Sequence, residues 1–363
     1  MVLRRANRRE PIDRAGIGVA VARCCVMVKA GLAGSPYMRR RDFIRIFGSA
    51  AAAWPLVARA QRQPMPVIGY LRSGSRVASS QLEAAFRQGL SSMGFIEGRN
   101  VAIDYQYAEN QNDRLVALTA DLLSQPVAVI YAGDNITAVM VKSATTTIPV
   151  VFRIGGDPTQ LGLVTSLSRP DGNMTGVSFL STATGAIRLQ MMREAVPNAA
   201  VMGLLVNPAN PNAELDTQEA QNAARKLGLE LHVVGASNAQ EIDAAFATLV
   251  QQRAHALVID GDTLFSNRRQ QLAALTTHHT MPAIYASREF PDAGGLMSYG
   301  ASNVDADRLG GIYVGRILKG DKPADLPVQQ AVKVELIINL ITAKVLGITL
   351  PPTLLARADK VIE

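Results

Sequence analysis

Short apolar runs rich in branched residues alternate with amphipathic segments, and this alternation starts again in the second half of the chain. Continuous apolar runs suit strands buried on both faces of a parallel sheet, and intervening helices supply the crossovers that parallel strands need. The sequence therefore predicts an α/β fold with two doubly wound parallel-sheet lobes. The expected strands are 66–71, 101–107, 127–131, 150–154, 201–206, 229–234, 256–259, 282–285 and 295–299. A last short helix is expected over 338–346.

The segment 149–180 is interpreted as the passage from the first lobe to the second. Its opening strand is broken by G-G-D-P at 155–158, after which 159–167 is expected to form a short helix. The turn signal R-P-D-G at 169–172 ends that helix, and a second extended run follows. In doubly wound sheets, ligands bind outside the carboxyl ends of the strands, where helix N-termini expose N–H groups. Two facing lobes are therefore expected to line one cleft.

An export signal is predicted at residues 38–60. A basic start precedes an apolar, alanine-rich run, and A-R-A at 58–60 matches the A-x-A cleavage pattern. The sequence R-R-D-F-I at 40–44 resembles the twin-arginine export motif. These features predict a protein that is exported to the periplasm and begins, after cleavage, at Gln61.

A short membrane anchor is the competing interpretation of the same residues. The apolar run is shorter than the ~20 residues that a spanning helix needs, and it contains Arg45 and Pro55. A cleaved signal is therefore favoured. Because such a signal belongs at the amino terminus, we interpret residues 1–37 as an extension and Met38 as the true start.

The charge balance changes once the leader is removed. The chain has 37 basic and 30 acidic residues, an excess that suggests a nucleic-acid or membrane partner. Residues 1–60 hold twelve of the basic and three of the acidic residues, which leaves 25 against 27 and a net charge of −2. Both cysteines, Cys24 and Cys25, also lie there, so the mature chain has no disulfide and no thiol chemistry. No nucleic-acid partner is expected.

Four long segments carry a resemblance to a known family: GDPTQLGLVTSLSRPDGNMTG at 156–176, ASREFPDAGGLMSYG at 286–300, ILKGDKPADLPVQQ at 317–330 and LARADKVIE at 355–363. With them, residues 66–363 resemble the substrate-binding proteins of ABC importers with the type I periplasmic-binding fold, in the branch related to tryptophan/tyrosine binders. The resemblance implies capture of a small solute in the periplasm and delivery to a membrane permease with its ATPase. No catalysis and no cofactor are expected.

The resemblance also implies a hinge of several crossovers between the lobes. We expect residues 61–178 with 301–325 to form lobe 1, and residues 179–300 with 326–363 to form lobe 2. The solute is expected to be an amino acid or another small carboxylate, with aromatic compounds as the favoured subclass. The protein is expected to be a monomer.

Polar and aromatic residues near strand ends of both lobes are the candidate ligand contacts: Ser73, Ser75, Asp134, Asn135, Asp157, Asn207, Asp260, Tyr285, Phe290 and Tyr299. A carboxylate pairs with a ligand amine, and an aromatic ring stacks on an apolar part. Asp157, Asp260 and Tyr285 in particular are expected to border one shared gap. Asp134, Asn135 and Asp157 equally suit helix caps and turns, and Asp262 favours a cap.

Signals for catalysis and metal binding are absent from the sequence. The chain beyond residue 60 lacks the nucleophile elbow, the phosphate-binding loop and the dinucleotide fingerprint. The histidines, His232, His255, His278 and His279, lack metal-site spacing, so no metal is expected. A ligand-responsive regulator would need a DNA-binding segment where the leader stands. The alternatives to transport are a periplasmic sensing module for a membrane receptor and an exported α/β enzyme.

Overall fold

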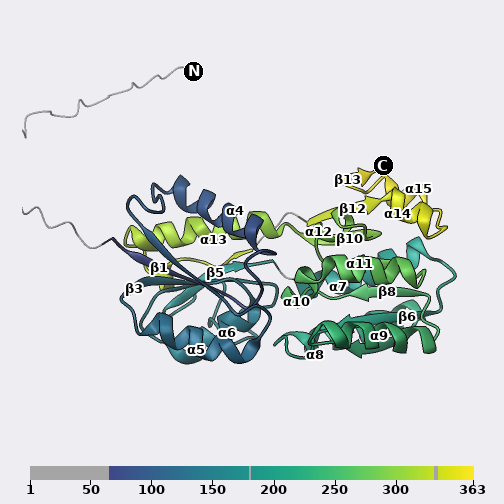
Figure 1. Cartoon of the computed structure of the whole chain (residues 1–363), viewed down its shortest axis with the longest axis horizontal. Coiled ribbons are helices and arrows are strands. Elements are labelled where there is room, and N and C mark those ends of the chain that lie inside the picture. Colours follow the sequence, from purple (N-terminus) through teal and green to yellow (C-terminus); the bar gives the residue numbers. More distant parts are fainter. Residues whose placement is uncertain (1–64, 180, 331–333) are drawn as a thin grey trace, which may run out of the picture. The chain divides into compact units, whose positions relative to one another are not determined.

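The computed structural model describes residues 65–363, apart from residue 180 and residues 331–333 (Figure 1). The predicted leader and the extension before it lie outside the described residues. Residues 65–363 form one unit that contains two β-sheets, each the centre of an α/β lobe. The predicted fold class is therefore confirmed.

The sheet of lobe 1 has the strand order β11-β5-β4-β3-β1-β2, and every neighbouring pair in it is parallel. Its central strands are apolar on both faces apart from Arg72 and Arg153, as expected of strands covered by helices on both sides. Its strands are β1 (Val67–Arg72), β2 (Ala102–Tyr107), β3 (Val127–Ala132), β4 (Val150–Ile154), β5 (Met174–Ser178) and β11 (Gln329–Gln330).

The sheet of lobe 2 has the order β13-β12-β10-β9-β8-β6-β7. Its strands are parallel except where β12 runs antiparallel to β10. The antiparallel pair was not expected from the sequence. The strands are β6 (Val201–Val206), β7 (Glu230–Gly235), β8 (Ala256–Ile259), β9 (Ala283–Tyr285), β10 (Met297–Ala301), β12 (Val334–Asn339) and β13 (Lys360–Ile362).

Helices cover both faces of each sheet. In lobe 1, α4 (Ser80–Ser92) and α13 (Asn303–Leu318) pack on one face, and α5 (Asn112–Leu123) and α6 (Asn135–Ala144) on the other (Figure 1). In lobe 2, α7 and α8 share a core on one face, and α9 and α11 share one on the other. Lobe 2 contains α7 (Ser181–Ala195), α8 (Ala213–Leu227), α9 (Ala239–Gln251), α10 (Thr263–Asn267), α11 (Arg269–His278), α12 (Glu289–Asp292), α14 (Leu340–Val345) and α15 (Pro352–Leu355).

Helices α4 and α13 approach each other closely because glycines stand at their contact. A Cβ atom on Gly89 would overlap the carbonyl oxygen of Arg308, and one on Gly311 would overlap the carbonyl oxygen of Phe86. Backbone atoms inside a packed helix pair cannot move aside, so both positions need glycine. Since α13 follows β10 of lobe 2, this contact ties the returning chain into lobe 1.

The chain passes between the two sheets more than once. It leaves lobe 1 after β5, returns after β10 to form α13, and leaves again after β11. Because β11 pairs with β5, residues Gln329 and Gln330 belong to the sheet of lobe 1, so the last crossover falls later than the expected boundary at residue 326.

Two expected helices differ from the structure. Residues 159–167 form turns instead of a helix, since Gly162 adopts a φ of +66°, which a continuing helix does not allow. The helix expected over 338–346 begins at Leu340, because β12 extends through Asn339 and pairs with β10. In the second case cross-strand pairing outweighs the local helical pattern.

Candidate functional site

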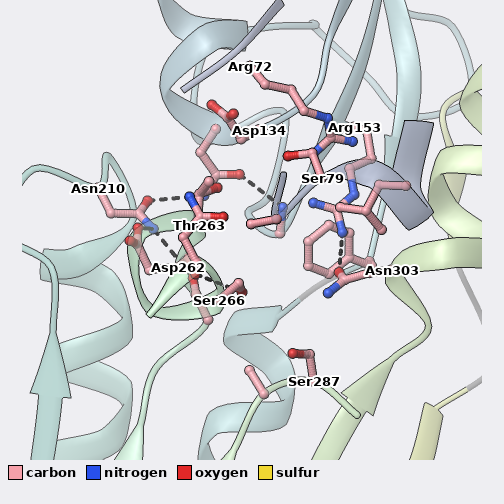
Figure 2. A pocket seen from close by; sticks show the side chains of 18 of the residues that line it. Arg72, Ser79, Asp134, Arg153, Asn210, Asp262, Thr263, Ser266, Ser287 and Asn303 are labelled. Atoms are coloured by element: carbon pink, nitrogen blue, oxygen red, sulfur yellow. Dashed lines mark hydrogen bonds between the residues drawn. The ribbon is translucent and has the colours of Figure 1, made fainter. Parts of the chain in front are cut away.

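One cavity is lined by residues of both lobes at the carboxyl ends of their strands (Figure 2). Lobe 1 contributes the ends of β1 and β4 and the starts of α4, α6 and α13, and lobe 2 contributes the segments after β8 and β9. The cavity encloses about 820 Å³ of empty space, including its open mouth. The cavity lies where ligands bind in doubly wound sheets, outside the carboxyl ends of the strands.

Asp134 fixes the start of α6 at the cavity wall. Its Oδ1 accepts a hydrogen bond from the backbone N–H of Thr137 at 3.0 Å, and the Asp134 N–H donates to the Thr137 hydroxyl, which completes a capping box. Its Oδ2 accepts from the N–H of Ser73 at 2.8 Å. Asp134 therefore joins the loop after β1 to the helix after β3.

Asn135 reaches from lobe 1 to lobe 2. Its Oδ1 accepts from the N–H of Gly155 at 2.9 Å, and its Nδ2 donates to Oδ1 of Asn210 at 3.0 Å. Asn210 in turn donates to Oδ2 of Asp262 at 2.9 Å (Figure 2). A continuous chain of hydrogen bonds thus crosses one side of the cavity.

A buried charge cluster backs the lobe 1 wall. Asp307 of α13 forms ion pairs with Arg72 and with Arg153, whose Nε lies 3.4 Å from its Oδ2. The hydroxyl of Tyr131 also donates to Asp307, at 2.7 Å. Burial by itself would lower the pKa of Arg72, but the adjacent Asp307 carboxylate raises it well above its usual value. Within this cluster two cations face one carboxylate, so the cluster carries a net positive charge.

Arg153 presents that charge to the cavity. Its Nη2 donates to Oδ1 of Asn303, the first residue of α13, and its guanidinium carbon lies 4.4 Å from the ring centroid of Phe179. Phe179 directly follows β5, where the chain leaves lobe 1, and Asn303 stands where it returns. Arg153 therefore contacts two of the segments that connect the lobes (Figure 2).

Two carboxylates line the lobe 2 side. Asp260 follows β8 and accepts a hydrogen bond from Arg188 at 3.2 Å, with both side chains buried. Burial lowers the pKa of Arg188, although Asp260 and Asp216 oppose the shift. Asp262 caps α10 by accepting from the N–H of Leu264 at 2.8 Å.

The pKa of Asp262 is displaced from its usual range. Burial raises it to about 6, against the opposing effect of hydrogen bonds from Asn207, Leu264 and Asn210. Near neutral pH this carboxyl is therefore ionised, and it becomes neutral in moderately acidic solution.

Phe290 is among the residues that line the cavity on the lobe 2 side, and its ring packs in the core of that lobe. It stacks on Tyr285, with centroids 4.3 Å apart and an interplanar angle of 14°. Ser287 also lines the cavity, and its hydroxyl is buried without a hydrogen-bond partner among the described residues. An unpaired buried hydroxyl costs free energy, so it is suited to a polar ligand group.

Among the described residues of 65–363, no group of three or more His, Cys, Asp or Glu side chains is arranged to hold a metal ion. Over the same part of the chain, the helices are too short or too polar to cross a bilayer.

A family model covers most of this chain. The model for ABC transporter substrate binding protein matches residues 76–362. The chain belongs to this family. It is accordingly a substrate-binding protein, which takes a small molecule as ligand and works with an ABC transporter, and proteins of this kind are typically periplasmic or extracellular.

Similar proteins support the same assignment. A tyrosine-binding protein of Clostridioides difficile (strain R20291) is 27% identical over 265 residues, which cover 72% of this chain and 75% of the relative. A conserved domain protein of Vibrio cholerae is 26% identical with a TM-score of 0.77. An ABC domain of Streptococcus pneumonia, solved in complex with L-Trp, is 25% identical with a TM-score of 0.75. Both structures cover 82% of this chain and 99% of their own.

These findings confirm the recognised family, its type I periplasmic-binding fold and the relation to tryptophan and tyrosine binders. The named relatives are binding proteins rather than enzymes.

Four of the residues singled out from the sequence of the substrate-binding protein line the cavity: Asp134, Asn135, Asp260 and Phe290. Each stands at or just beyond the carboxyl end of a strand, where the rule for parallel sheets places ligand contacts. Asp134 and Asp262 also act as helix caps, so for them the two interpretations hold together.

Three lobe 1 candidates take structural positions away from the cavity lining. The N–H of Ser73 bonds to Asp134, and the hydroxyl of Ser75 accepts from the N–H of Ala78. Asp157 closes the turn that follows it, accepting from Thr159 and Gln160. Burial would raise the pKa of Asp157, but these hydrogen bonds outweigh it and lower the pKa.

Three lobe 2 candidates also lie outside the cavity lining. The Nδ2 of Asn207 donates to Asp262 at 3.0 Å. Tyr285 is fully buried and shares its hydroxyl hydrogen bond with Thr276, so its ring faces the core of lobe 2 and not the cavity. Tyr299 packs against the core on the other face of the same sheet. Of the three residues expected to border one gap, only Asp260 lines the cavity.

Several cavity residues were not predicted, among them Arg72, Arg153, Phe179, Asn210 and Asn303. Arg153 carried a signal, because an arginine inside the apolar run 150–154 needs a buried partner. That partner, Asp307, lies on α13 and becomes a neighbour only through the return crossover.

Proposed function

We propose that this protein captures an amino acid or related small carboxylate, with aromatic amino acids as the favoured class, in the cavity between its lobes. It delivers the solute to the permease and ATPase of an ABC-type importer. The observation that carries the proposal is one cavity in which lobe 1 supplies a cation, lobe 2 supplies carboxylates and both supply a phenyl ring. The relatives named for tyrosine or solved with L-Trp support the aromatic class.

The charges of the cavity suit a zwitterion. Arg153 carries the charge that Asp307 leaves unbalanced, and the start of α4 adds N–H groups, since its N-cap Ser79 makes no side-chain cap hydrogen bond. We assign the solute carboxylate to this wall. The ammonium group is assigned to Asp260, whose two oxygens keep acceptor capacity beyond the bond from Arg188.

The side chain of the solute is assigned to the space between Phe179 and Phe290. Phe179 already has the Arg153 guanidinium near its ring, and Phe290 is backed by Tyr285, so both rings are held in place. Rigid rings give an aromatic solute contact area at little entropic cost. When the solute bridges both walls, it binds the closed arrangement more strongly than an open one and shifts the population toward closure.

The location follows from the leader. Residues 38–60 are proposed to direct export through the twin-arginine route and to be removed before Gln61. Released in this way, the protein meets its solute in the periplasm.

Binding is tested by calorimetry and thermal shift with L-tyrosine, L-tryptophan and L-phenylalanine. A ligand of the native state raises the melting temperature with its concentration as RT ln(1 + [L]/Kd) requires. Tyramine, which lacks the carboxylate, and 3-(4-hydroxyphenyl)propionate, which lacks the amine, are both expected to bind roughly 100-fold more weakly than tyrosine.

The matched variants are Arg153→Gln and Arg316→Gln. Arg316 lies on α13 but pairs with Asp321 in solvent, away from the cavity lining. Arg153→Gln is expected to weaken tyrosine binding about tenfold or more, and Arg316→Gln to leave it unchanged. Tyrosine and tyramine binding equally well would contradict the carboxylate assignment, and no binding of any aromatic amino acid would contradict the solute class.

A further inference from the structure

Asparagine side chains join the two lobes at two places. The Asn135 Nδ2 donates to Oδ1 of Asn210 at 3.0 Å, and the Asn267 Nδ2 donates to Oδ1 of Asn110 at 2.6 Å. Asn110 and Asn135 belong to lobe 1, and Asn210 and Asn267 belong to lobe 2. The described structure therefore shows the lobes in contact, with amide groups meeting amide groups.

Glycines of lobe 1 face asparagines of lobe 2 at the same interface. A Cβ atom added to Gly74 would lie 2.6 Å from Nδ2 of Asn267 and 2.8 Å from Cγ2 of Thr263. One added to Gly156 would overlap the side-chain amide of Asn212. Both contacts are too short for a real Cβ atom, so the facing side chains of Asn267 and Asn212 would have to shift, and Asn212 is buried.

The local backbone does not explain these glycines. Neither Gly74 nor Gly156 is among the residues with positive φ, where L side chains are strained. Crowding at Gly156 arises from Asn212, the residue before α8 on the opposite lobe. At both positions, a side chain of lobe 2 occupies the space that a Cβ atom would need.

We propose that Gly74 and Gly156 are the points on lobe 1 against which Asn267 and Asn212 of lobe 2 come to rest on closure, and that these positions set how closely the lobes approach. The inference rests on the proposed function, because it concerns closure of the same cavity. Its positions differ from the residues assigned to hold the solute. A methyl group at either glycine acts as a wedge that raises the free energy of the closed form.

A wedge of this kind changes affinity without touching the ligand. If only the closed form holds the solute firmly, the apparent Kd rises as the closed fraction falls. Gly156 is the better position for a test, because its neighbour Asn212 makes no side-chain cap hydrogen bond to α8 and its side chain is removable. Glycine is also accepted at an N-cap position.

Closure is measured without any ligand by disulfide trapping at the other glycine. The full chain carries Cys24→Ser and Cys25→Ser, with Gly74→Cys and Thr263→Cys as the reporter pair. The Cβ that Gly74→Cys introduces is present in every variant, so differences between variants report the change at Gly156 alone. The short distance from an added Cβ at Gly74 to Cγ2 of Thr263 fits a disulfide, whose Cβ atoms lie about 3.8 Å apart. The rate of cross-linking under diamide reports how often the lobes close, even when closure is rare.

In this background Gly156→Ala is expected to slow cross-linking about tenfold or more, and adding Asn212→Gly is expected to restore most of the rate. Gly185→Ala is the matched control, because a Cβ there meets only Arg188 Nη2, at an ordinary 3.7 Å. The proposal is overturned if Gly156→Ala cross-links as fast as the parent, or if Asn212→Gly fails to rescue it.

The outcome is separable from that of the proposed function. Acceleration of trapping by L-tyrosine or L-tryptophan tests the solute class, whereas the wedge and its relief are compared with no ligand present. Circular dichroism of each reduced variant checks folding. If the reporter pair does not fold, spin labels at Val116→Cys on α5 and Val250→Cys on α9, both exposed, replace it. Gly156→Ala is then expected to lengthen the interlobe distance, and an unchanged distance overturns the proposal.

Discussion

Asp307 is the residue whose loss the fold tolerates least at the cavity wall. It is completely buried and faces Arg72 and Arg153, so its removal leaves two buried cations without their carboxylate. Breaking a buried ion pair by deleting one partner typically costs about 3–5 kcal/mol. We expect Asp307→Ala to lower the free energy of unfolding by about this amount, as measured by urea denaturation.

Asp321→Ala is the matched control. Asp321 also pairs with an arginine of α13, Arg316, at 2.8 Å, but both side chains are more than 40% exposed. An exposed pair contributes only about 0–1 kcal/mol. Similar losses for the two variants would show that the buried cluster does not hold the wall together.

Asp262 gives the protein a defined pH response. Its carboxyl binds a proton more tightly in the folded state, where the pKa is about 6, than in the unfolded chain, where it is about 3.9. Its contribution to stability is therefore greatest below the unfolded pKa and declines as the pH rises toward 6. We expect wild type to lose stability relative to Asp262→Asn between about pH 4 and 6.

The measurement is a set of urea titrations of both proteins at pH 4.5, 6 and 7.5. Comparison with Asp262→Asn cancels the response of every other titrating group that the substitution leaves unchanged. Parallel stability curves for the two proteins would contradict the raised pKa.

At the same scale, the sequence predicted acidic site residues better than basic ones. Asp134 and Asp260 follow apolar strands directly, so the strand-end rule identifies them. Arg72 and Arg153 belong to the strands themselves, and only the distant Asp307 makes their burial possible. Tyr285 was expected to contact the ligand, but side chains alternate along a strand and the ring of Tyr285 faces the core.

At the scale of elements, the start of α6 depends on one side chain. Asp134 caps the helix and accepts the N–H of Ser73, so Asp134→Ala leaves both the first turn and a buried loop amide without their acceptor. We expect a loss of about 1–3 kcal/mol in the free energy of unfolding.

Asn238→Ala provides the comparison, since Asn238 caps α9 through Glu241 at the protein surface. Exposed caps contribute roughly 0.5–1 kcal/mol. Thermal and urea unfolding measure the loss of stability in Asp134→Ala and in Asn238→Ala. An equal loss in the two variants would show that the hydrogen bond from Ser73 to Asp134 contributes nothing.

Most strands were predicted within a few residues, because continuous branched runs such as 127–131 and 201–206 have few other uses. The segments that were predicted wrongly have local patterns that pairing with distant strands overrides. The helix predicted from residue 338 loses Ile338 and Asn339 to β12, which pairs antiparallel with β10. A two-residue strand such as β11 carries too little pattern to be assigned to either sheet from sequence.

At the scale of the whole molecule, export is the property that remains to be measured. We expect Arg40→Lys with Arg41→Lys to retain the precursor in the cytoplasm of a Gram-negative host, because the twin-arginine receptor reads both guanidinium groups. Cell fractionation and mass spectrometry of the periplasmic product follow the effect, and the product is expected to begin at Gln61.

A second arginine pair in the same chain serves as the control. Arg8→Lys with Arg9→Lys alters residues that precede Met38 and is expected to leave export unchanged. Retention caused by the pair at 8–9, or a product that keeps residues 38–60, would contradict the proposed signal.

The two-lobed architecture followed from the alternation of strands and helices, but the way the chain divides between lobes did not. Local patterns describe single elements, whereas membership of a sheet depends on pairing between segments far apart, such as β5 with β11. The expected division between the lobes came from resemblance, and it placed Gln329 and Gln330 in the wrong lobe.

The glycine-mediated contact of α4 with α13 has a consequence for how the polypeptide is made. A ribosome delivers α4 early, but its packing partner emerges only after β6 to β10 have been synthesised. Until then one face of the first sheet lacks half of its cover, and its apolar side chains stay accessible to chaperones. A fragment that ends between the lobes therefore lacks α13, and we expect it to be insoluble.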